Sequence, residues 1–400
     1  MDTEIQERYD RQARTPGWDQ SSVQNGAVAI VGVGALGCEV AKNLALMGIG
    51  KLVLIDNDVV ELSNLSRQML FTENDIGKPK SEVAAQKIKS MNRFVDVVYY
   101  NSDVRQLPEK VFEDSDVVCS CLDSWGVRRW LNSLCVSLGK PMVDGSIEGF
   151  YGNVQVVIPG RTACLECHGE NLISREERLA ECTLRRRSPD ELVKDLMEQG
   201  IVISREVAEE LFRLNIKTIY DLKYSKLENI INELAPELSK LILEVRDRLK
   251  PKSPAIQSVS ATIAGLMTTQ VIKLLHKGRL GEPDTGLFVY DALHSRLTRV
   301  KLARMKECIV CGDVEEQVQS INAHPDWTIQ TLKEIIALRY SFPDPEILHG
   351  TKRLNDDQKL IDAGIRDEDI IYISTSRRHM PLPLKMKLTG DPKDKDTKHA

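Results

Sequence analysis

Several features that would place a protein in a special class are missing from these 400 residues. The chain has no apolar run of about 18 residues or more, so a membrane-spanning helix is not expected. Its first residues, Met1-Asp-Thr-Glu-Ile-Gln-Glu, lack the basic-then-apolar order of a secretory signal. The chain also has no internal repeat. We therefore expect a cytoplasmic protein with no membrane partner.

An excess of positive charge is missing as well. The sequence has 54 Lys and Arg against 59 Asp and Glu, which gives a net charge of −5 and a pI near 5.9. Without a basic surface, nucleic-acid binding is not expected. With 42% hydrophobic and 28% charged residues, the composition is that of a globular protein, and its length allows two or three domains.

Strand and helix patterns alternate from Val28 to about Ile158. Such alternation predicts an α/β fold with a doubly wound, Rossmann-like and mostly parallel sheet, whose ligands bind at the carboxyl ends of the strands. Residues 183–250 lose all strand character and are predicted to form a helical insertion. A helix at 258–275 and two further strands then return the chain to the first domain. The strands of the first part are expected near 28–32, 51–56, 95–101, 116–122, 141–144 and 153–158.

A glycine-rich loop follows the first of these strands. Gly32, Gly34 and Gly37 allow a tight turn and let backbone amides approach a phosphate at a helix amino terminus. Asp56 ends the next strand 19 residues later, where a carboxylate can reach ribose hydroxyls. This combination predicts a nucleotide site, and a nicotinamide dehydrogenase shares it.

The residues after Asp56 favour ATP over NAD. Arg67 and Lys80 add positive charges that suit phosphates, while Asp58 and Asn64 add oxygen ligands. Asp123 follows the strand at 116–122, where a carboxylate can hold Mg²⁺ against phosphates. We assign the ATP site to these residues together with Gln68 and the glycine loop.

The nine cysteines fall into three groups. Cys164 and Cys167 form one C-x-x-C and Cys308 and Cys311 another, and four thiolates are the ligand set of a closed zinc site. A redox dithiol at either pair is the alternative. Cys182 precedes three arginines, whose charge favours the thiolate, although a spare surface cysteine would look the same. The remaining four, Cys38, Cys119, Cys121 and Cys135, are expected to be buried and inert.

In order along the chain, these motifs resemble those of the activating enzymes of ubiquitin and ubiquitin-like proteins, and of their relatives that adenylate the sulfur carriers of molybdopterin and thiamine synthesis. The resemblance covers roughly residues 7–312. It is carried by Arg8-Tyr-Asp-Arg11-Gln12, the glycine loop, Asp56-x-Asp58, Asn64-Leu-Ser-Arg67-Gln68, Gly77-Lys-Pro-Lys80, Cys121-Leu-Asp123 and Asp144-Gly-Ser-Ile-Glu148.

The resemblance implies a role for individual residues. Arg67 and Lys80 would contact ATP phosphates, Asp123 would bind magnesium, and Arg11 would reach into the site of a partner subunit. Because one chain carries both that arginine and a complete site, we expect a homodimer. The resemblance also implies that Cys182 is the nucleophile that forms the thioester.

The segment after Cys311 resembles ubiquitin itself, with a strand, a helix at 328–338 and a closing strand at 370–373. No terminal Gly-Gly follows, so we do not expect it to be a conjugated modifier. We interpret it as a ubiquitin-fold domain that recruits a conjugating enzyme, with a small β-grasp appendage as the alternative. The expected domains are 1–181 (adenylation), 182–252 (catalytic-cysteine insertion), 253–312 (adenylation, continued), 313–376 (ubiquitin fold) and 377–400 (mostly disordered tail).

These observations predict an enzyme that uses MgATP to adenylate a ubiquitin-like protein ending in Gly-Gly and then forms a thioester on Cys182. A sulfur-carrier adenylyltransferase needs the same ATP site without the thioester. A non-catalytic scaffold would be expected to have degraded ATP residues. A dehydrogenase remains a distant alternative.

Overall fold

The structure is a computed structural model, and it describes residues 3–169, 188–198, 200–214, 216, 222, 236–249, 254–313, 318–340, 342, 344–349, 352–375, 378–379 and 381–388. The chain divides into two compact units. The first comprises Met1–Gly169, Ala255–Gln319 and Ser376–Leu382, and the second Glu170–Pro254, Ser320–Thr375 and Pro383–Ala400.

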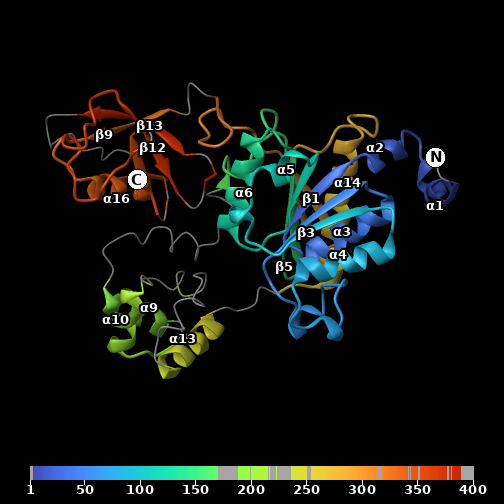
Figure 1. The fold of residues 1–400 in the computed structure, drawn as a ribbon, viewed down its shortest axis with the longest axis horizontal. Coiled ribbons are helices and arrows are strands. Elements are labelled where there is room, and N and C mark those ends of the chain that lie inside the picture. The colour runs from blue at the N-terminus through green and yellow to red at the C-terminus, as the bar shows by residue number, and fades with distance from the viewer. Residues whose placement is uncertain are drawn as a thin grey trace. The chain divides into compact units, whose positions relative to one another are not determined.

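The first unit is built on an eight-stranded sheet with the order β3-β2-β1-β4-β5-β6-β7-β8 (Figure 1). The pairs from β3 to β5 are parallel, whereas those from β5 to β8 are antiparallel. This confirms the predicted α/β class with a mostly parallel sheet. The strands are β1 (Ala27–Val31), β2 (Lys51–Ile55), β3 (Asp96–Tyr100), β4 (Val117–Ser120), β5 (Met142–Glu148), β6 (Tyr151–Val157), β7 (Leu287–Asp291) and β8 (Arg296–Val300).

The helices of this unit connect and cover the strands. All five residues of β1 are buried, as expected for a central parallel strand covered on both faces. The main helices are α1 (Thr3–Ala13), α2 (Gln20–Gln24), α3 (Ala35–Met47), α4 (Lys80–Met91), α5 (Lys110–Glu113), α6 (Trp125–Ser137) and α14 (Gln257–Leu275), with short 3₁₀ helices η1 (Leu62–Asn64), η2 (Glu73–Asp75) and η3 (Val104–Gln106).

Helix α14 returns the chain to the centre of the first unit. Its 19 residues are long and apolar enough to cross a membrane by length and composition alone. However, Ile263 and Met267 are fully buried in the main core. A β-carbon on Gly152 would come within 2.4 Å of Ile263 Cγ1, and one on Gly145 within 2.3 Å of Met267 Sδ. These close approaches identify α14 as the core helix of the first unit.

The described part of residues 188–249, in the second unit, is helical. It contains α9 (Pro189–Glu198), α10 (Arg205–Arg213) and α13 (Pro236–Leu249), which share a small apolar core that includes Leu196, Leu211 and Ile242. Cys182 lies outside the described residues. The predicted helical character therefore holds where the structure describes it, and the domain boundaries stay predictions.

The second unit also contains a five-stranded sheet with the order β11-β10-β12-β13-β9. Helix α16 (Ile329–Tyr340) lies between β9 and β10 along the chain and buries Ile329, Leu332 and Ile336. The strands are β9 (Gln319–Ala323), β10 (Glu346–His349), β11 (Lys352–Arg353), β12 (Ile370–Ser374) and β13 (Leu382–Leu388).

Strand β13 corrects the prediction of a mostly disordered tail from residue 377. It lies between β12 and β9, and the amide of Met386 donates to the carbonyl of Asp369 at 2.8 Å. Leu382, Leu384 and Met386 are fully buried. Alternate residues of a strand face the same side of the sheet. Pro383 and Lys385 stand between these apolar residues and hide the alternation in the sequence.

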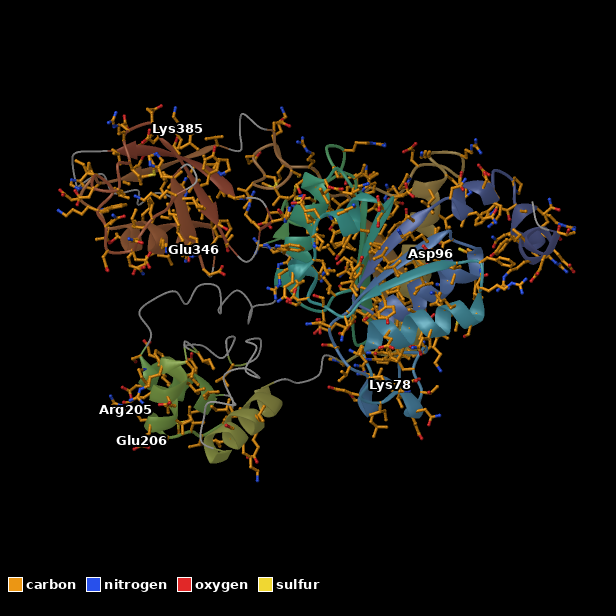
Figure 2. The ribbon with its side chains drawn as sticks, viewed as in Figure 1. Lys78, Asp96, Arg205, Glu206, Glu346 and Lys385 are labelled. Carbon is orange, nitrogen blue, oxygen red and sulfur yellow. The ribbon has the colours of Figure 1, made fainter. Side chains whose placement is uncertain are left out.

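We expect L384A to lower the free energy of unfolding by about 2–5 kcal/mol, because it removes a fully buried side chain. K385A is the matched control. Lys385, which is labelled in Figure 2, is part-exposed and pairs with Glu368, and exposed ion pairs contribute about 0–1 kcal/mol. Denaturant unfolding and hydrogen exchange of β9 would measure both, and equal effects would contradict the central position of β13.

Candidate nucleotide site and four-cysteine centre

Parallel pairing brings three predicted segments to one edge of the sheet. The glycine loop follows β1, Asp56 follows β2 and Asp123 follows β4, and both β2 and β4 pair in parallel with β1. The loops after β1 and β4 leave this edge on either side of the point where the strand order reverses. That is the place where open α/β sheets bind ligands.

The three glycines of the loop have different surroundings. Gly32 has φ +88°, and a β-carbon there would come within 2.6 Å of the Cys121 carbonyl oxygen. A β-carbon on Gly37 would lie 1.9 Å from the Gly32 carbonyl oxygen. Beside Gly34, by contrast, the nearest atom would be Gln68 Nε2 at 3.8 Å. The protein itself requires Gly32 and Gly37, whereas Gly34 leaves open space at the amino terminus of α3.

Asp56 connects the glycine loop to the loop that follows β2. Its Oδ2 accepts from the amide of Val33 at 2.6 Å, and its Oδ1 accepts from the amide of Asp58 at 2.8 Å. Burial raises the pKa of Asp56, and nearby Lys80 acts in the opposite direction. The carboxylate therefore fixes the relative positions of both loops at the edge of the sheet where β1, β2 and β4 end, which we call the nucleotide edge.

Lys80 begins α4 and its side chain is buried. Its Nζ donates to Asp58 Oδ2 at 2.8 Å, and its amide donates to the Asp58 carbonyl at 2.9 Å. Burial alone would lower the pKa of Lys80, but Asp56 and Asp58 outweigh it and the pKa lies above its usual range. Lys80 is thus a buried cation at this edge of the sheet, and such a cation is suited to bind a phosphate.

The segment around η1 carries the other predicted ATP residues. Asn64 Oδ1 accepts from the amide of Glu61 at 2.9 Å, so its side chain holds the turn. Arg67 Nη1 donates to the Ser63 carbonyl at 2.8 Å. Gln68 is 4% exposed, and its Oε1 has no hydrogen-bond partner within the described part of the chain. The Nε2 of the same side chain borders the space beside Gly34, and the unsatisfied Oε1 fits a nucleotide hydroxyl or amine.

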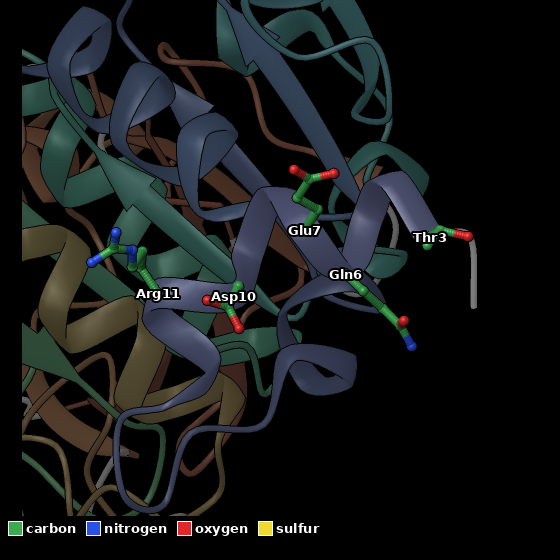
Figure 3. Close-up of a pocket in the computed structure, with 5 residues that line it drawn as sticks. All are labelled: Thr3, Gln6, Glu7, Asp10 and Arg11. Atoms are coloured by element: carbon green, nitrogen blue, oxygen red, sulfur yellow. The ribbon is translucent and has the colours of Figure 1, made fainter.

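Asp123 and Arg11 occupy different places in the first unit. Asp123 is exposed in the short loop between β4 and α6. Arg11 is exposed on α1, in a shallow hollow lined by Thr3, Gln6, Glu7, Asp10 and Arg11 (Figure 3). No residue of the glycine loop lines this hollow.

Helix α1 is fixed at the carboxyl end of α3. Tyr9 is buried, and its hydroxyl accepts from Asn92 Nδ2 at 2.7 Å. A β-carbon on Gly48 would come within 2.4 Å of the Tyr9 ring, and Gln12 Nε2 donates to the Met47 carbonyl at 2.7 Å. The glycine loop is at the other end of α3, about 20 Å away for a helix of this length. The structure therefore does not bring Arg11 into the nucleotide site of its own chain.

The four predicted zinc ligands come together as one cluster. The sulfur atoms of Cys164, Cys167, Cys308 and Cys311 all lie within 4.8 Å of one another, and all four residues are buried. The Cys167–Cys311, Cys164–Cys308 and Cys164–Cys167 sulfur pairs are 3.4, 3.7 and 4.0 Å apart. Tetrahedral zinc with Zn–S bonds of about 2.3 Å needs about 3.8 Å between sulfurs. The cluster thus fits zinc.

The four thiols of the cluster act on one another. Hydrogen bonding with Cys164 lowers the pKa of Cys167 and of Cys311, whereas the pKa of Cys164 and of Cys308 is raised. In addition, the amide of Met305 donates to Cys167 Sγ at 3.5 Å. Elsewhere, burial raises the pKa of Cys119 to about 12 and also raises that of Cys38, Cys121 and Cys135. The latter thiols stay protonated near pH 7, in agreement with the prediction that they are inert.

Sequence reasoning missed two buried ion pairs of α6. Arg128 pairs with Asp144 on β5, and Arg129 pairs with Glu166 inside the first C-x-x-C. The only sequence signal was a pair of arginines in an otherwise apolar helix. Their partners depend on strand register and chain return, which the sequence does not display.

The sheet and its edge define a Rossmann-like nucleotide-binding domain with an attached four-cysteine centre. The model of the ThiF family matches residues 9–310. The NEDD8-activating enzyme E1 catalytic subunit of Saccharomyces cerevisiae is 30% identical over 308 residues, which cover 72% of this chain and 97% of the relative. The protein of the same name from Caenorhabditis elegans is 28% identical, over 83% of this chain and 80% of the relative.

The chain therefore belongs to the ThiF family and, within it, to the enzymes that activate ubiquitin-like proteins. The SUMO-activating enzyme subunit 2 of Dictyostelium discoideum is 34% identical over 41% of this chain and 24% of the relative. The solved structure of the microcin C7 biosynthetic enzyme MccB with N-formylated MccA shares the fold, with a TM-score of 0.52 at 23% identity over 76% of this chain and 75% of that one. The family predicted from the motifs is confirmed, and the roles of single residues stay predictions.

We expect G34A and G32A to separate binding from stability. Gly34→Ala should keep the melting temperature within a few degrees, because no protein atom obstructs its β-carbon, and should weaken ATP binding at least tenfold. Gly32→Ala should lower the melting temperature, because of the positive φ and the 2.6 Å approach to the Cys121 carbonyl oxygen. Calorimetric ATP titration and thermal unfolding measure the two effects. Unchanged ATP affinity in G34A would contradict the site.

We also expect one zinc ion per chain, measured by elemental mass spectrometry. Cys308→Ala should lose the metal and unfold at a lower temperature, because three thiolates no longer close the tetrahedron. Cys135→Ala removes a buried thiol outside the cluster and should retain zinc. Full zinc content in C308A would show that the four cysteines are not the ligand set.

Proposed function

We propose that this chain uses MgATP to adenylate the carboxyl-terminal glycine of a ubiquitin-like protein, and that it then captures the acyl group as a thioester on Cys182. The main support is the nucleotide edge of the first unit, which carries a buried cationic lysine, an unsatisfied buried amide and a glycine with space beside it. The names of the yeast and nematode relatives favour a modifier of the NEDD8 type.

In the first step, a carboxylate oxygen of the modifier attacks the α-phosphorus of ATP, an acyl–phosphate bond forms and pyrophosphate leaves. Lys80 and Arg67 bind the phosphates, so the negative charge of the leaving group is held by fixed cations. Asp58 releases Lys80 in part when phosphate arrives, because both compete for the same ammonium group. Gln68 and the glycine loop bind the nucleoside and its phosphates.

Asp123 would supply an oxygen ligand for magnesium, which would neutralise phosphate charge. The position of Asp123 at the end of β4, beside the glycine loop after β1, supports this role. Lys80 and the amino terminus of α3 approach the same edge from the side of β1 and β2. The triphosphate would then lie between cations and the metal-binding carboxylate.

In the second step, the sulfur of Cys182 attacks the carbonyl carbon of the acyl adenylate, a thioester forms and AMP leaves. Arg185, Arg186 and Arg187 follow this cysteine in the sequence and favour its thiolate form. The four-cysteine centre holds the return segment at 308–311 against the segment at 164–167, from which the chain continues towards Cys182.

A second subunit would complete the enzyme. Arg11 is exposed on α1, about one helix length from its own glycine loop, and this distance supports our assignment of Arg11 to the site of another chain. A homodimer is our prediction from the sequence alone. The relatives are named catalytic subunits, which favours pairing with a different chain. The mass of the purified protein, alone and co-expressed with its partner, decides between these assemblies.

The sheet and helix of residues 319–388 would recruit the conjugating enzyme that receives the thioester-bound modifier. In this sheet β12 and β13 are neighbours, with β10 on one side and β9 on the other, and α16 contributes an apolar face to the core. We place the whole reaction in the cytoplasm, where the thiols of Cys182 and of the four-cysteine centre stay reduced.

We expect Cys182→Ala to abolish the thioester and to retain adenylation. With a NEDD8-type modifier and MgATP, the wild type should give a conjugate that dithiothreitol removes, together with ATP–pyrophosphate exchange. C182A should lose the conjugate and keep the exchange, and C135A should keep both. A reducible conjugate in C182A would show that another thiol is the nucleophile.

A sulfur-carrier adenylyltransferase is the second candidate, because the ThiF family match spans residues 9–310 without the segment that follows. It would adenylate the same kind of carboxylate and pass it to a sulfur donor. Mass spectrometry of the modifier distinguishes the two functions. A thiocarboxylate at its terminal glycine would favour the second candidate over thioester transfer.

A further inference from the structure

Helix α6 carries two consecutive buried arginines. Arg128 and Arg129 are 9% and 6% exposed, in a helix that also buries Trp130, Leu131 and Leu134. Arginines are almost never buried unless they are paired. Both of these are paired, and their partners lie on two different segments of the first unit.

Arg128 connects the start of α6 to the nucleotide edge. Its Nε donates to Asp144 Oδ1 at 3.0 Å and its Nη2 to Asp144 Oδ2 at 2.5 Å, a two-point contact. Asp144 is 1% exposed and lies opposite Ser120, the last residue of β4. The amide of Arg128 donates to the carbonyl of Ser124 at 3.0 Å. The guanidinium of Arg128 thus ties the start of α6 to β5, the strand beside the end of β4 and the loop that carries Asp123.

Arg129 connects the same helix to the four-cysteine centre. Its Nε donates to Glu166 Oε2 at 2.8 Å, and its Nη2 donates to Glu166 Oε1. Glu166 lies between Cys164 and Cys167. The neighbouring residue Leu165 donates its amide to Asn132 Oδ1 of α6 at 3.1 Å. The first C-x-x-C is therefore attached to α6 at two points.

Consecutive residues of a helix project about 100° apart. One side-chain contact leaves a helix free to turn about its axis, whereas two contacts in different directions fix its rotation as well as its place. Buried ion pairs contribute little net stability compared with apolar packing. We therefore infer that these two pairs serve to fix the geometry of the helix. Lysine cannot replace arginine here, since it offers one point of contact instead of a planar fork.

We propose that Arg128 and Arg129 are positioning residues that fix the rotation of α6 and thereby aim Asp123 at the magnesium of MgATP. The inference rests on the proposed role of Asp123. The proposal also gives the four-cysteine centre a role in placing α6, because Glu166 of the first C-x-x-C is paired with Arg129 of that helix. Both arginine side chains are paired with protein carboxylates, and we assign them no contact with the nucleotide.

The test measures how much Mg²⁺ tightens ATP binding, by calorimetric titration of ATP with Mg²⁺ and with EDTA. Wild-type protein should bind ATP more tightly with Mg²⁺, and D123N should lose this gain. Arg128→Lys, Arg129→Lys and Asp144→Asn should each reduce the gain about tenfold and leave the affinity in EDTA within about twofold. In the D123N background, the same three changes should have no further effect, because they act through Asp123.

Arg105→Lys is the matched control. Arg105 makes the same two-point contact with Asp103, at 3.0 and 2.7 Å, but on an exposed turn. R105K should keep the full Mg²⁺ gain. Because D144N leaves a buried arginine without its partner and can fail to fold, the lysine variants, which keep the charge, decide the question in that case.

Two results would overturn the proposal. An equal loss of ATP affinity in EDTA and in Mg²⁺ would make the arginines general supports of the fold, and a full Mg²⁺ gain in both lysine variants would show that they do not aim Asp123. R129K should also retain its zinc, so that the effect is not a loss of the centre. The titration needs no modifier. A wild type that binds MgATP but releases no pyrophosphate when a NEDD8-type modifier is added would therefore refute the proposed function and leave this inference testable.

Discussion

The approach of Gly32 to the carbonyl of Cys121 is the constraint on which the nucleotide edge depends. The loops after β1 and β4 cross there, with space for a hydrogen atom and not for a methyl group. Because they cross so closely, α3 and the Asp123 loop start from neighbouring points. Asp56 then accepts from the glycine loop and from the following loop. A larger residue at position 32 would displace both sides of the site together.

Charge in this region is concentrated on a few buried groups. Lys80 is buried and remains cationic because Asp56 and Asp58 compensate for its loss of water. On α6, two further buried cations have carboxylate partners of their own. Lys80 and its partner Asp58 leave a cation that a phosphate could also contact. Each arginine of α6, by contrast, is held by a carboxylate in a two-point contact. The exposed partner Asp58 thus separates Lys80, our proposed phosphate ligand, from the two arginines, whose carboxylate partners are largely buried.

The sequence predicted the strands of the first unit well, because β1, β2 and β4 are continuous apolar segments ended by polar residues. It also predicted the cysteine cluster from two C-x-x-C motifs. It missed β13, where Pro381, Pro383 and the lysines hide the alternation of Leu382, Leu384 and Met386. The pairing of Arg128 with Asp144 could not be read from the sequence either, since it depends on the register between β4 and β5. Cys182 lies outside the described residues, so its surroundings stay a prediction.

Strand β13 has a consequence for the order in which the protein is made. The ribosome releases residues 382–388 after every other described strand, yet this strand lies between β12 and β9. Until it emerges, β9 has no neighbour in the sheet and β12 exposes an unpaired edge. This five-stranded sheet can therefore be completed only after residue 388 has left the ribosome, and until then its unpaired strand edges are open to aggregation and mispairing.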